Sequence, residues 1–229
     1  MASQPSSPVP AGDADHALRK EIIAACRAMN GLGINQGTAG NIGVRHGDGL
    51  LITPSGIPYD VLAPEDIVWL GFDGRVEGLR APSSEWRFHR DILAARPDLN
   101  AVVHTHAIHA TAIAMTRRDL PAVHYMIAAA GGSTIRCAPY ATFGTEELSH
   151  HALAALEGRS ACLLANHGMI ACGTSLDKAL WLAVEVETLA EQYLLACRFG
   201  EPVVLDEDEI AVVVEKFKTY GPRAKGEDA

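Results

Sequence analysis

The chain has 229 residues, 48% of them hydrophobic and 21% charged, which are ordinary values for a globular protein with one α/β domain. Its 28 acidic and 19 basic residues give a net charge of -9, and no basic run occurs, so the composition argues against nucleic-acid binding. No stretch approaches the ~18 consecutive apolar residues that span a membrane. The five cysteines are scattered, odd in number and mostly within apolar segments, which predicts reduced thiols in a cytoplasmic protein. No C-x-x-C pair occurs, which argues against a thiolate zinc site.

The predicted elements follow a leader, residues 1–15, whose Pro, Ser, Gly and Ala content predicts disorder and which lacks the apolar segment of a secretory signal. Hydrophobic spacing and turn residues then predict short strands and helices. In the first half of the chain these are a helix from Asp15, its N-cap, to residue 30; strands over 41–45 and 50–53 joined by a Gly-Asp-Gly turn; a strand within 67–74; a helix within 83–96 capped by Ser83 or Ser84; a strand over 101–106; and a short helix over 107–115.

The second half of the chain continues with the same mixture of elements. These are a strand over 135–140; a helix over 145–158; two strands within 160–173 joined at 166–168; the longest helix, over 175–200, capped by Ser175; and a last helix over 206–221. Hairpin-linked strands beside helices predict an α/β fold with a mixed, largely antiparallel sheet that helices cover.

The segment AVVHTH at residues 101–106 places two histidines in a predicted strand. Side chains alternate between the faces of a strand, so His104 and His106 share one face and are well placed to bind one metal ion. His167, in an Asn-His-Gly turn between two apolar strands, is a candidate third ligand, and three histidines leave a zinc position open for substrate. Histidines that hydrogen-bond at a strand end or within their own turn explain the same patterns. His109 lies on the following helix and does not share the face.

The segment PSSEWRFH puts hydroxyls and a carboxylate at the start of a predicted helix. Ser83 and Ser84, together with the N–H groups of a helix N-terminus, suit an anion such as phosphate. Glu85, placed in the first turn, is a candidate base beside that anion, although a simple interaction with the helix dipole explains it equally. Two further turns, GTAGN at 37–41 and TPSG at 53–56, have the same Gly and hydroxyl character.

The ordered set of motifs resembles the class II aldolase/adducin family. The resemblance covers about residues 16–221 and rests on GTAGN, LLITPSGIPY, PSSEWRFH, AVVHTHAIH, VHYMIAAAGG, CAPYATFGT, NHGMIACG and EKFKTYG. It implies one three-layer α/β/α domain over 16–221, followed by a flexible tail over 222–229. It also implies a cyclic homotetramer with active sites between subunits.

The resemblance implies one zinc ion per subunit, with His104, His106, His167 and, at rest, Glu85 as its ligands. Glu85 is expected to leave the metal when substrate arrives and to act as the catalytic acid and base. Tyr125 is expected to reach the site of a neighbouring subunit and to protonate the aldehyde-side oxygen. The remaining substrate contacts that the resemblance implies are Asn41, Ser55, Gly56, Ser83 and Ser84 around the phosphate, and Phe143 and Tyr220 along the aldehyde.

The reaction that the resemblance implies is reversible cleavage of L-fuculose 1-phosphate, or a close ketose 1-phosphate, to dihydroxyacetone phosphate and L-lactaldehyde. Zinc stabilises the enediolate that this cleavage leaves, so no Schiff-base lysine is needed, and none occurs in the motifs. The same fold also serves ribulose-phosphate 4-epimerases, thioribulose-phosphate dehydratases and other deoxy-sugar-phosphate aldolases. A non-enzymatic adducin-like assembly domain is a remoter alternative, because such domains lack the full metal set.

Overall fold

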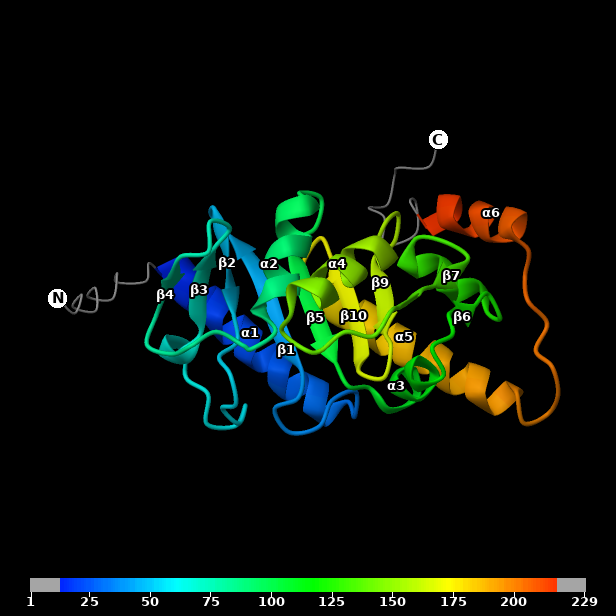
Figure 1. Cartoon of the computed structure of the whole chain (residues 1–229), viewed down its shortest axis with the longest axis horizontal. Coiled ribbons are helices and arrows are strands. Elements are labelled where there is room, and N and C mark those ends of the chain that lie inside the picture. The colour runs from blue at the N-terminus through cyan, green and yellow to red at the C-terminus, as the bar shows by residue number, and fades with distance from the viewer. Residues whose placement is uncertain (1–12, 218–229) are drawn as a thin grey trace, which may run out of the picture.

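An eight-stranded mixed sheet forms the centre of the computed structural model, which describes residues 13–217 (Figure 1). The strand order is β4-β3-β2-β1-β5-β10-β9-β8, and all neighbours are antiparallel except the parallel pair β8 and β9. The expected mixed, largely antiparallel sheet is thereby confirmed. The strands are β1 (Asn41–His46), β2 (Gly49–Ile52), β3 (Val68–Gly71), β4 (Val76–Glu77), β5 (Ala101–Thr105), β8 (Cys137–Ala138), β9 (Ala161–Leu164) and β10 (Gly168–Gly173), with β6 (Leu120–Pro121) and β7 (Thr134–Ile135) in a separate sheet.

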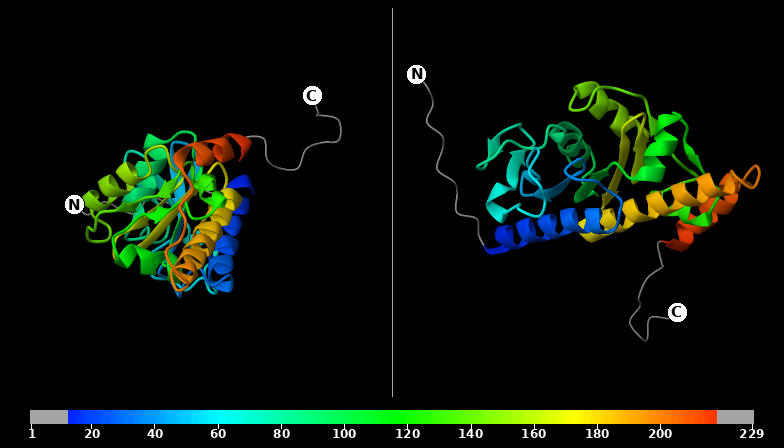
Figure 2. Two further views of the ribbon diagram at one scale, coloured as in Figure 1. Left: turned by 90° about the vertical axis from the view of Figure 1, so that its right-hand side faces the viewer. Right: turned by 90° about the horizontal axis from the view of Figure 1, so that it is seen from below.

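Helices cover both faces of the sheet, which confirms the expected layering (Figure 2). On one face lie α1 (Asp13–Gly31) and α5 (Leu176–Ala196), with α3 (Ile108–Met115) packed against α5. On the other face lie α2 (Trp86–Ala95) and α4 (Glu146–Ala155). Two short 3-10 helices are η1 (Pro64–Asp66) and η2 (Tyr125–Ala130), and α6 (Glu207–Phe217) packs against η2.

Strand residues alternate between two hydrophobic cores, one on each face of the sheet. Ala101 and Val103 of β5 pack into the core with α1 and α5, whereas Val102 packs into the core with α2 and α4. Because side chains alternate along a strand, His104 points to the same face as Val102. The register of β1 and β5 places Asn41 directly opposite His104. The sheet therefore presents polar side chains beneath the start of α2.

The start of α2 differs from the prediction. The helix begins at Trp86 with Glu85 as its N-cap, so neither Ser83 nor Ser84 is the capping residue and Glu85 does not lie in the first turn. The hydroxyl of Ser83 accepts the backbone N–H of Glu85 at 3.2 Å, which holds both serines in the turn before the helix. The Glu85 side chain makes no capping hydrogen bond and is free to turn toward the sheet.

Two other boundaries also differ from the prediction. α1 already includes Asp13, so Asp15 is not its N-cap but lies within the helix and pairs with Arg19 at 3.0 Å. The single strand expected over 135–140 is divided between β7 and β8, which belong to different sheets. Arg136 separates them and donates to the carbonyl oxygen of Glu157 at 2.7 Å, just beyond α4.

The long C-terminal helices agree with the sequence as far as the structure describes them. Ser175 caps α5 as expected, because its hydroxyl accepts the N–H of Lys178 at 3.3 Å. The last predicted helix is α6, and its expected residues 218–221 lie outside the described part of the chain, as do most of the expected leader and the expected tail. Within residues 13–217, no helix is both long enough and apolar enough to cross a membrane.

Candidate active site

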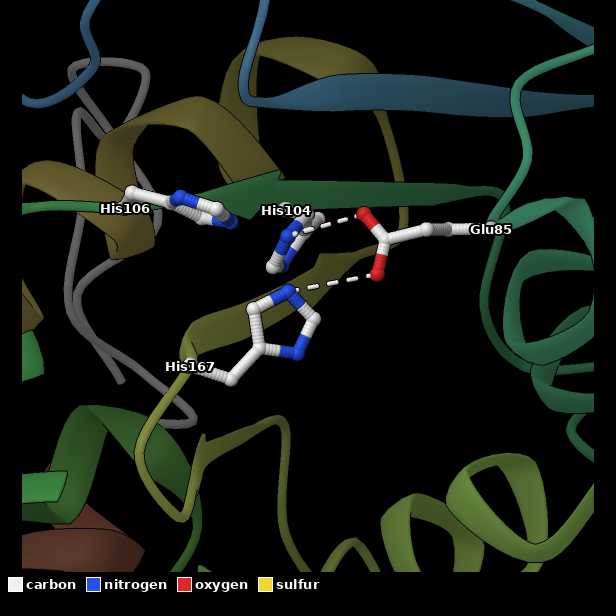
Figure 3. Close-up of side chains that lie close together, drawn as sticks. All are labelled: Glu85, His104, His106 and His167. Atoms are coloured by element: carbon white, nitrogen blue, oxygen red, sulfur yellow. Dashed lines mark ion pairs between the residues drawn. The ribbon is translucent and has the colours of Figure 1, made fainter. Parts of the chain in front are cut away.

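Four side chains from three separate segments of the chain converge beside the end of β5 (Figure 3). They are Glu85 at the N-cap of α2, His104 in β5, His106 directly after β5, and His167 in the turn between β9 and β10. One nitrogen or oxygen atom from each lies within 4.8 Å of the others. The structure thus brings together all four residues expected to bind metal. His109 is not among them, since it pairs with Glu187 at 2.9 Å.

The hydrogen bonding of His104 fixes which of its ring nitrogens faces the cluster. Its Nδ1 lies 2.9 Å from the carbonyl oxygen of Met169, and a carbonyl only accepts, so Nδ1 carries the proton. The nitrogen that faces the cluster is therefore Nε2, which lies 3.2 Å from Oε2 of Glu85. Metal-binding histidines commonly use this arrangement, in which the second nitrogen donates to a backbone carbonyl.

The ligand atoms of the cluster fit a shared cation. Oε1 of Glu85 and the Nε2 atoms of His104 and His106 are buried, and none has a hydrogen-bond partner within the described part of the chain. Nε2 of His167 lies 3.2 Å from Oε1 of Glu85. Buried polar atoms are normally paired, so atoms that face one another without hydrogen bonds point to a missing common partner. Imidazole nitrogens and one carboxylate form a donor set suited to a divalent metal such as zinc.

Electrostatics keep these groups in their metal-binding protonation states. The pKa of His106 and of His167 is lowered to about 4, mainly by burial and to a smaller extent by the nearby His104. Both rings are therefore neutral near pH 7. Burial alone would raise the pKa of Glu85. The imidazoles of His104 and His167 and the amide of Asn41 outweigh it and hold the pKa well below its ordinary value, so the carboxylate is ionised.

The turn that carries His167 depends on its two neighbours. Asn166 has a φ of 55°, a left-handed conformation that asparagine tolerates better than most residues, and its side chain accepts from Arg117 at 2.9 Å. A Cβ on Gly168 would lie 2.5 Å from the carbonyl oxygen of Thr105, so no larger residue fits between the turn and β5. The Asn-His-Gly sequence therefore lets His167 approach the strand that carries His104.

Asn41 and His89 form a second layer behind the carboxylate. Nδ2 of Asn41 donates to Oε2 of Glu85 at 3.0 Å, and Oδ1 of Asn41 pairs with Nε2 of His89. All three residues are buried. His89 was not among the predicted site residues, although one signal was present: it follows Glu85 by four residues, a spacing that places two side chains on the same face of a helix. Asn41 was expected at the phosphate, and its amide nitrogen contacts the carboxylate.

The serine-rich turns lie together next to Glu85. A bridge between Pro54 and Pro82 brings the turn with Ser55 and Gly56 against the turn before α2. The backbone N–H of Ser83 donates to the carbonyl of Thr53 at 2.9 Å, and that of Ser55 donates to Ala81 at 3.3 Å. Ser83 is buried, whereas Ser55, Gly56 and Ser84 are exposed. Three of the expected phosphate residues, Ser55, Gly56 and Ser84, are thus exposed on two adjoining turns, whereas Ser83 and Asn41 are buried.

Of the three aromatic residues expected at the substrate, the two that the structure describes, Tyr125 and Phe143, do not join the cluster. Tyr125 opens η2, is 49% exposed, and has its ring 6.5 Å from that of Phe217 in α6. Phe143 is 63% exposed in the loop between β8 and α4. Tyr220 lies outside the described residues. An exposed tyrosine away from its own chain's cluster is compatible with a role in another subunit.

A buried carboxylate and three convergent imidazoles, next to an exposed serine-rich surface, define a metal-dependent enzyme site rather than a closed thiolate cage. The family model described as Class II Aldolase and Adducin N-terminal domain matches residues 20–194. The chain belongs to this family.

Relatives of known activity extend over nearly the whole chain. L-fuculose phosphate aldolase of Escherichia coli is 58% identical over 207 residues, which are 90% of this chain and 96% of that protein. The 5-methylthioribulose-1-phosphate/5-deoxyribulose-1-phosphate aldolase of Rhodospirillum rubrum is 60% identical over 209 residues, 91% of this chain and 95% of that protein. A solved structure of an L-fuculose 1-phosphate aldolase superposes with a TM-score of 0.86 at 43% identity, covering 88% of this chain and 96% of the other.

Proposed function

We propose that the protein is a zinc-dependent aldolase that reversibly cleaves L-fuculose 1-phosphate, or a close deoxyketose 1-phosphate, between C3 and C4. The products are dihydroxyacetone phosphate and an aldehyde, L-lactaldehyde in the first case. The observation that carries the proposal is the convergence of Glu85 with three histidines, beside the serine turns, in a chain 58% identical to an L-fuculose phosphate aldolase. Such an enzyme would act in the breakdown of a deoxy sugar such as fucose.

His104, His106 and His167 are the residues that would hold the zinc, with Glu85 as a fourth ligand at rest. When bound, the metal supplies a Lewis acid that stabilises the negative charge left on the dihydroxyacetone phosphate half. The neutral imidazoles support this role, because zinc binds the unprotonated nitrogen. The chain then needs no lysine as a covalent catalyst.

Glu85 is the proposed proton carrier at C3. Its carboxylate is ionised and buried beside the three histidines, so it can remove a proton from C3 in the condensation direction and return it during cleavage. Tyr125 of a neighbouring subunit is the proposed acid for the aldehyde-side oxygen, and Phe143 and Tyr220 the proposed lining of the aldehyde side. The exposure of Tyr125 and of Phe143 supports a site that a second subunit completes, as in a homotetramer.

The phosphate would lie against the turns that precede α2. Asn41, Ser55, Gly56, Ser83 and Ser84 are the proposed contacts, through hydroxyls, amides and backbone N–H groups. Neutral donors of this kind hold an anion despite the net charge of -9. A fixed phosphate keeps C2 and C3 of the substrate in register with Glu85.

A second candidate substrate has an observation of its own. The relative from Rhodospirillum rubrum, at 60% identity, is named for 5-methylthioribulose 1-phosphate and 5-deoxyribulose 1-phosphate. These compounds and L-fuculose 1-phosphate share the dihydroxyacetone phosphate half and differ only in the aldehyde. The aldehyde halves differ by small groups, a hydroxyl in one and a methylthio group in another. Because a single hydroxyl or methyl group changes binding by only about 1–3 kcal/mol in a pocket, one enzyme can cleave more than one of these substrates.

A substrate panel tests the proposal. Zinc-loaded protein is mixed with each of the three ketose 1-phosphates, and released dihydroxyacetone phosphate is measured with a coupled dehydrogenase. We expect release from at least one of them, with the largest kcat/KM identifying the aldehyde. No release from any of the three by folded, zinc-loaded protein would reject the proposed aldolase.

The five unpaired cysteines are consistent with the cytoplasm as the proposed location.

A further inference from the structure

The imidazole of His89 is completely buried on α2 and takes no part in the four-residue cluster. Its Nε2 pairs with Oδ1 of Asn41, and its Nδ1 is buried without a hydrogen-bond partner in the part of the chain that the structure describes. A buried polar atom without a hydrogen-bond partner lowers the stability of the fold. His89 therefore requires an explanation beyond packing.

The chemistry of the neighbouring groups fixes the polarity of this hydrogen-bond chain. The ionised carboxylate of Glu85 only accepts, so the Asn41 atom that contacts it, 3.0 Å away, must be the amide nitrogen. The amide oxygen of Asn41 then faces His89 and only accepts as well. His89 must donate from Nε2, which leaves Nδ1 unprotonated in the neutral ring. A His89 ring protonated at Nε2 and an ionised Glu85 thus require the same orientation of the Asn41 amide.

The backbone of β1 is adapted to this ring. A Cβ on Gly43 would lie 2.8 Å from Nδ1 of His89 and 3.2 Å from its Cβ. Glycine at this position lets the imidazole lie against the strand, two residues along from Asn41. The strand therefore supplies both the hydrogen-bond partner of His89 and the space for its ring.

We propose that His89 is a positioning residue that acts through Asn41 to hold the Glu85 carboxylate toward the three histidines. The N–H of His89 keeps the Asn41 amide oriented so that its nitrogen, not its oxygen, faces Glu85. Without this donor only Glu85 orients the amide, so the amide nitrogen is held less firmly toward the carboxylate. The proposal rests on the proposed function in one respect, namely that Glu85 is one of the ligands of a bound metal.

Two variants of matched length separate the donor from packing. His89→Gln keeps an N–H near the position of Nε2, whereas His89→Met has similar length and no donor. The zinc affinity of each folded variant is measured by competition with a chromophoric chelator. We expect His89→Met to weaken zinc binding about 10-fold, because partners of metal ligands typically contribute 10–100-fold, and His89→Gln to stay within about 3-fold of wild type. Equal losses in both variants would show a packing role and overturn the proposal.

A double-mutant cycle tests whether His89 acts through Asn41. Asn41→Leu alone should weaken zinc binding to a similar extent as His89→Met. Adding His89→Met to Asn41→Leu should then weaken zinc binding little further, because the hydrogen-bond chain from His89 through Asn41 to Glu85 is already broken. Losses that multiply would mean that His89 influences the site independently, which contradicts the proposal.

The tautomer itself gives a test on the unmodified protein. In histidine-labelled wild type, the long-range ¹H–¹⁵N signals absent from His89→Gln belong to His89, and they should report a neutral ring protonated at Nε2. Protonation at Nδ1 would overturn the proposal whatever the variants do. Failure of the proposed function is visible separately: wild type would bind zinc, and respond to these substitutions, yet release no dihydroxyacetone phosphate from any ketose 1-phosphate.

Discussion

Replacing Glu85 with glutamine removes the proposed proton carrier while keeping its size. The carboxylate is buried, ionised and 3.2 Å from Nε2 of both His104 and His167. If it served only as an acidic group at the N-terminus of α2, its loss would cost less than about 1 kcal/mol of stability and would leave the rate unchanged. As the base at C3 it contributes roughly 10²- to 10⁴-fold in rate. Glu85→Gln should therefore slow proton transfer at C3 at least about 100-fold.

Hydrogen exchange isolates this step from aldehyde binding. Dihydroxyacetone phosphate is incubated with the zinc-loaded protein in deuterated water, and NMR follows the loss of the C3 proton signal. The three histidines should still bind zinc in Glu85→Gln, although more weakly, and the phosphate turns are unchanged, so the ligand should still bind. Near-normal exchange in a folded, zinc-loaded variant would refute the assignment and point to another base.

Three further predictions address the metal, the phosphate and the protonation state. His104→Ala and His167→Ala should each lose most of the bound zinc in metal analysis, whereas the exposed His150→Ala should keep it; full occupancy in all three would reject the ligand assignment. Ser83→Ala combined with Ser84→Ala should raise KM for phosphorylated substrates with little change in kcat, and the opposite pattern would show that the serines are not mainly a phosphate clamp. The pKa of His167 is about 4 in the fold and near 6.5 when unfolded, so the unfolded state binds more protons between these values. As pH falls from about 7 to 5, metal-free wild type should therefore lose more thermal stability than metal-free His167→Gln, and an equal loss in both would contradict the pKa shift.

The metal cluster was predictable because its main signals are local. Strand alternation alone places His104 and His106 on one face, and the Asn-His-Gly turn exposes His167 at the end of a strand. Their convergence on Glu85 needed the family resemblance, since α2 and β5 are distant from the turn at His167 along the chain. The longest helix, α5, was equally predictable from the sequence, because Ser175 is a common type of N-cap residue.

The contacts of Asn41 and His89 with each other and with Glu85 were not predictable, because they depend on how α2 packs across β1. The pairing of Asn41 with His104 is set by sheet register, and the contact of Asn41 with His89 is set by the space that Gly43 leaves. Neither follows from hydrophobic spacing. The cap of α2 was misassigned for a related reason: Ser83 and Ser84 are good capping residues, yet the turn bonds Ser83 to the backbone of Glu85 instead.

The proposed function depends on the histidine cluster being the metal centre of an aldolase. Stepwise addition of zinc to chelator-treated, metal-free protein, with dihydroxyacetone phosphate release measured at each step, tests it most directly. We predict that the metal-free protein is inactive and that activity rises linearly and stops at one zinc per chain. Equal release before and after zinc is added would contradict the claim.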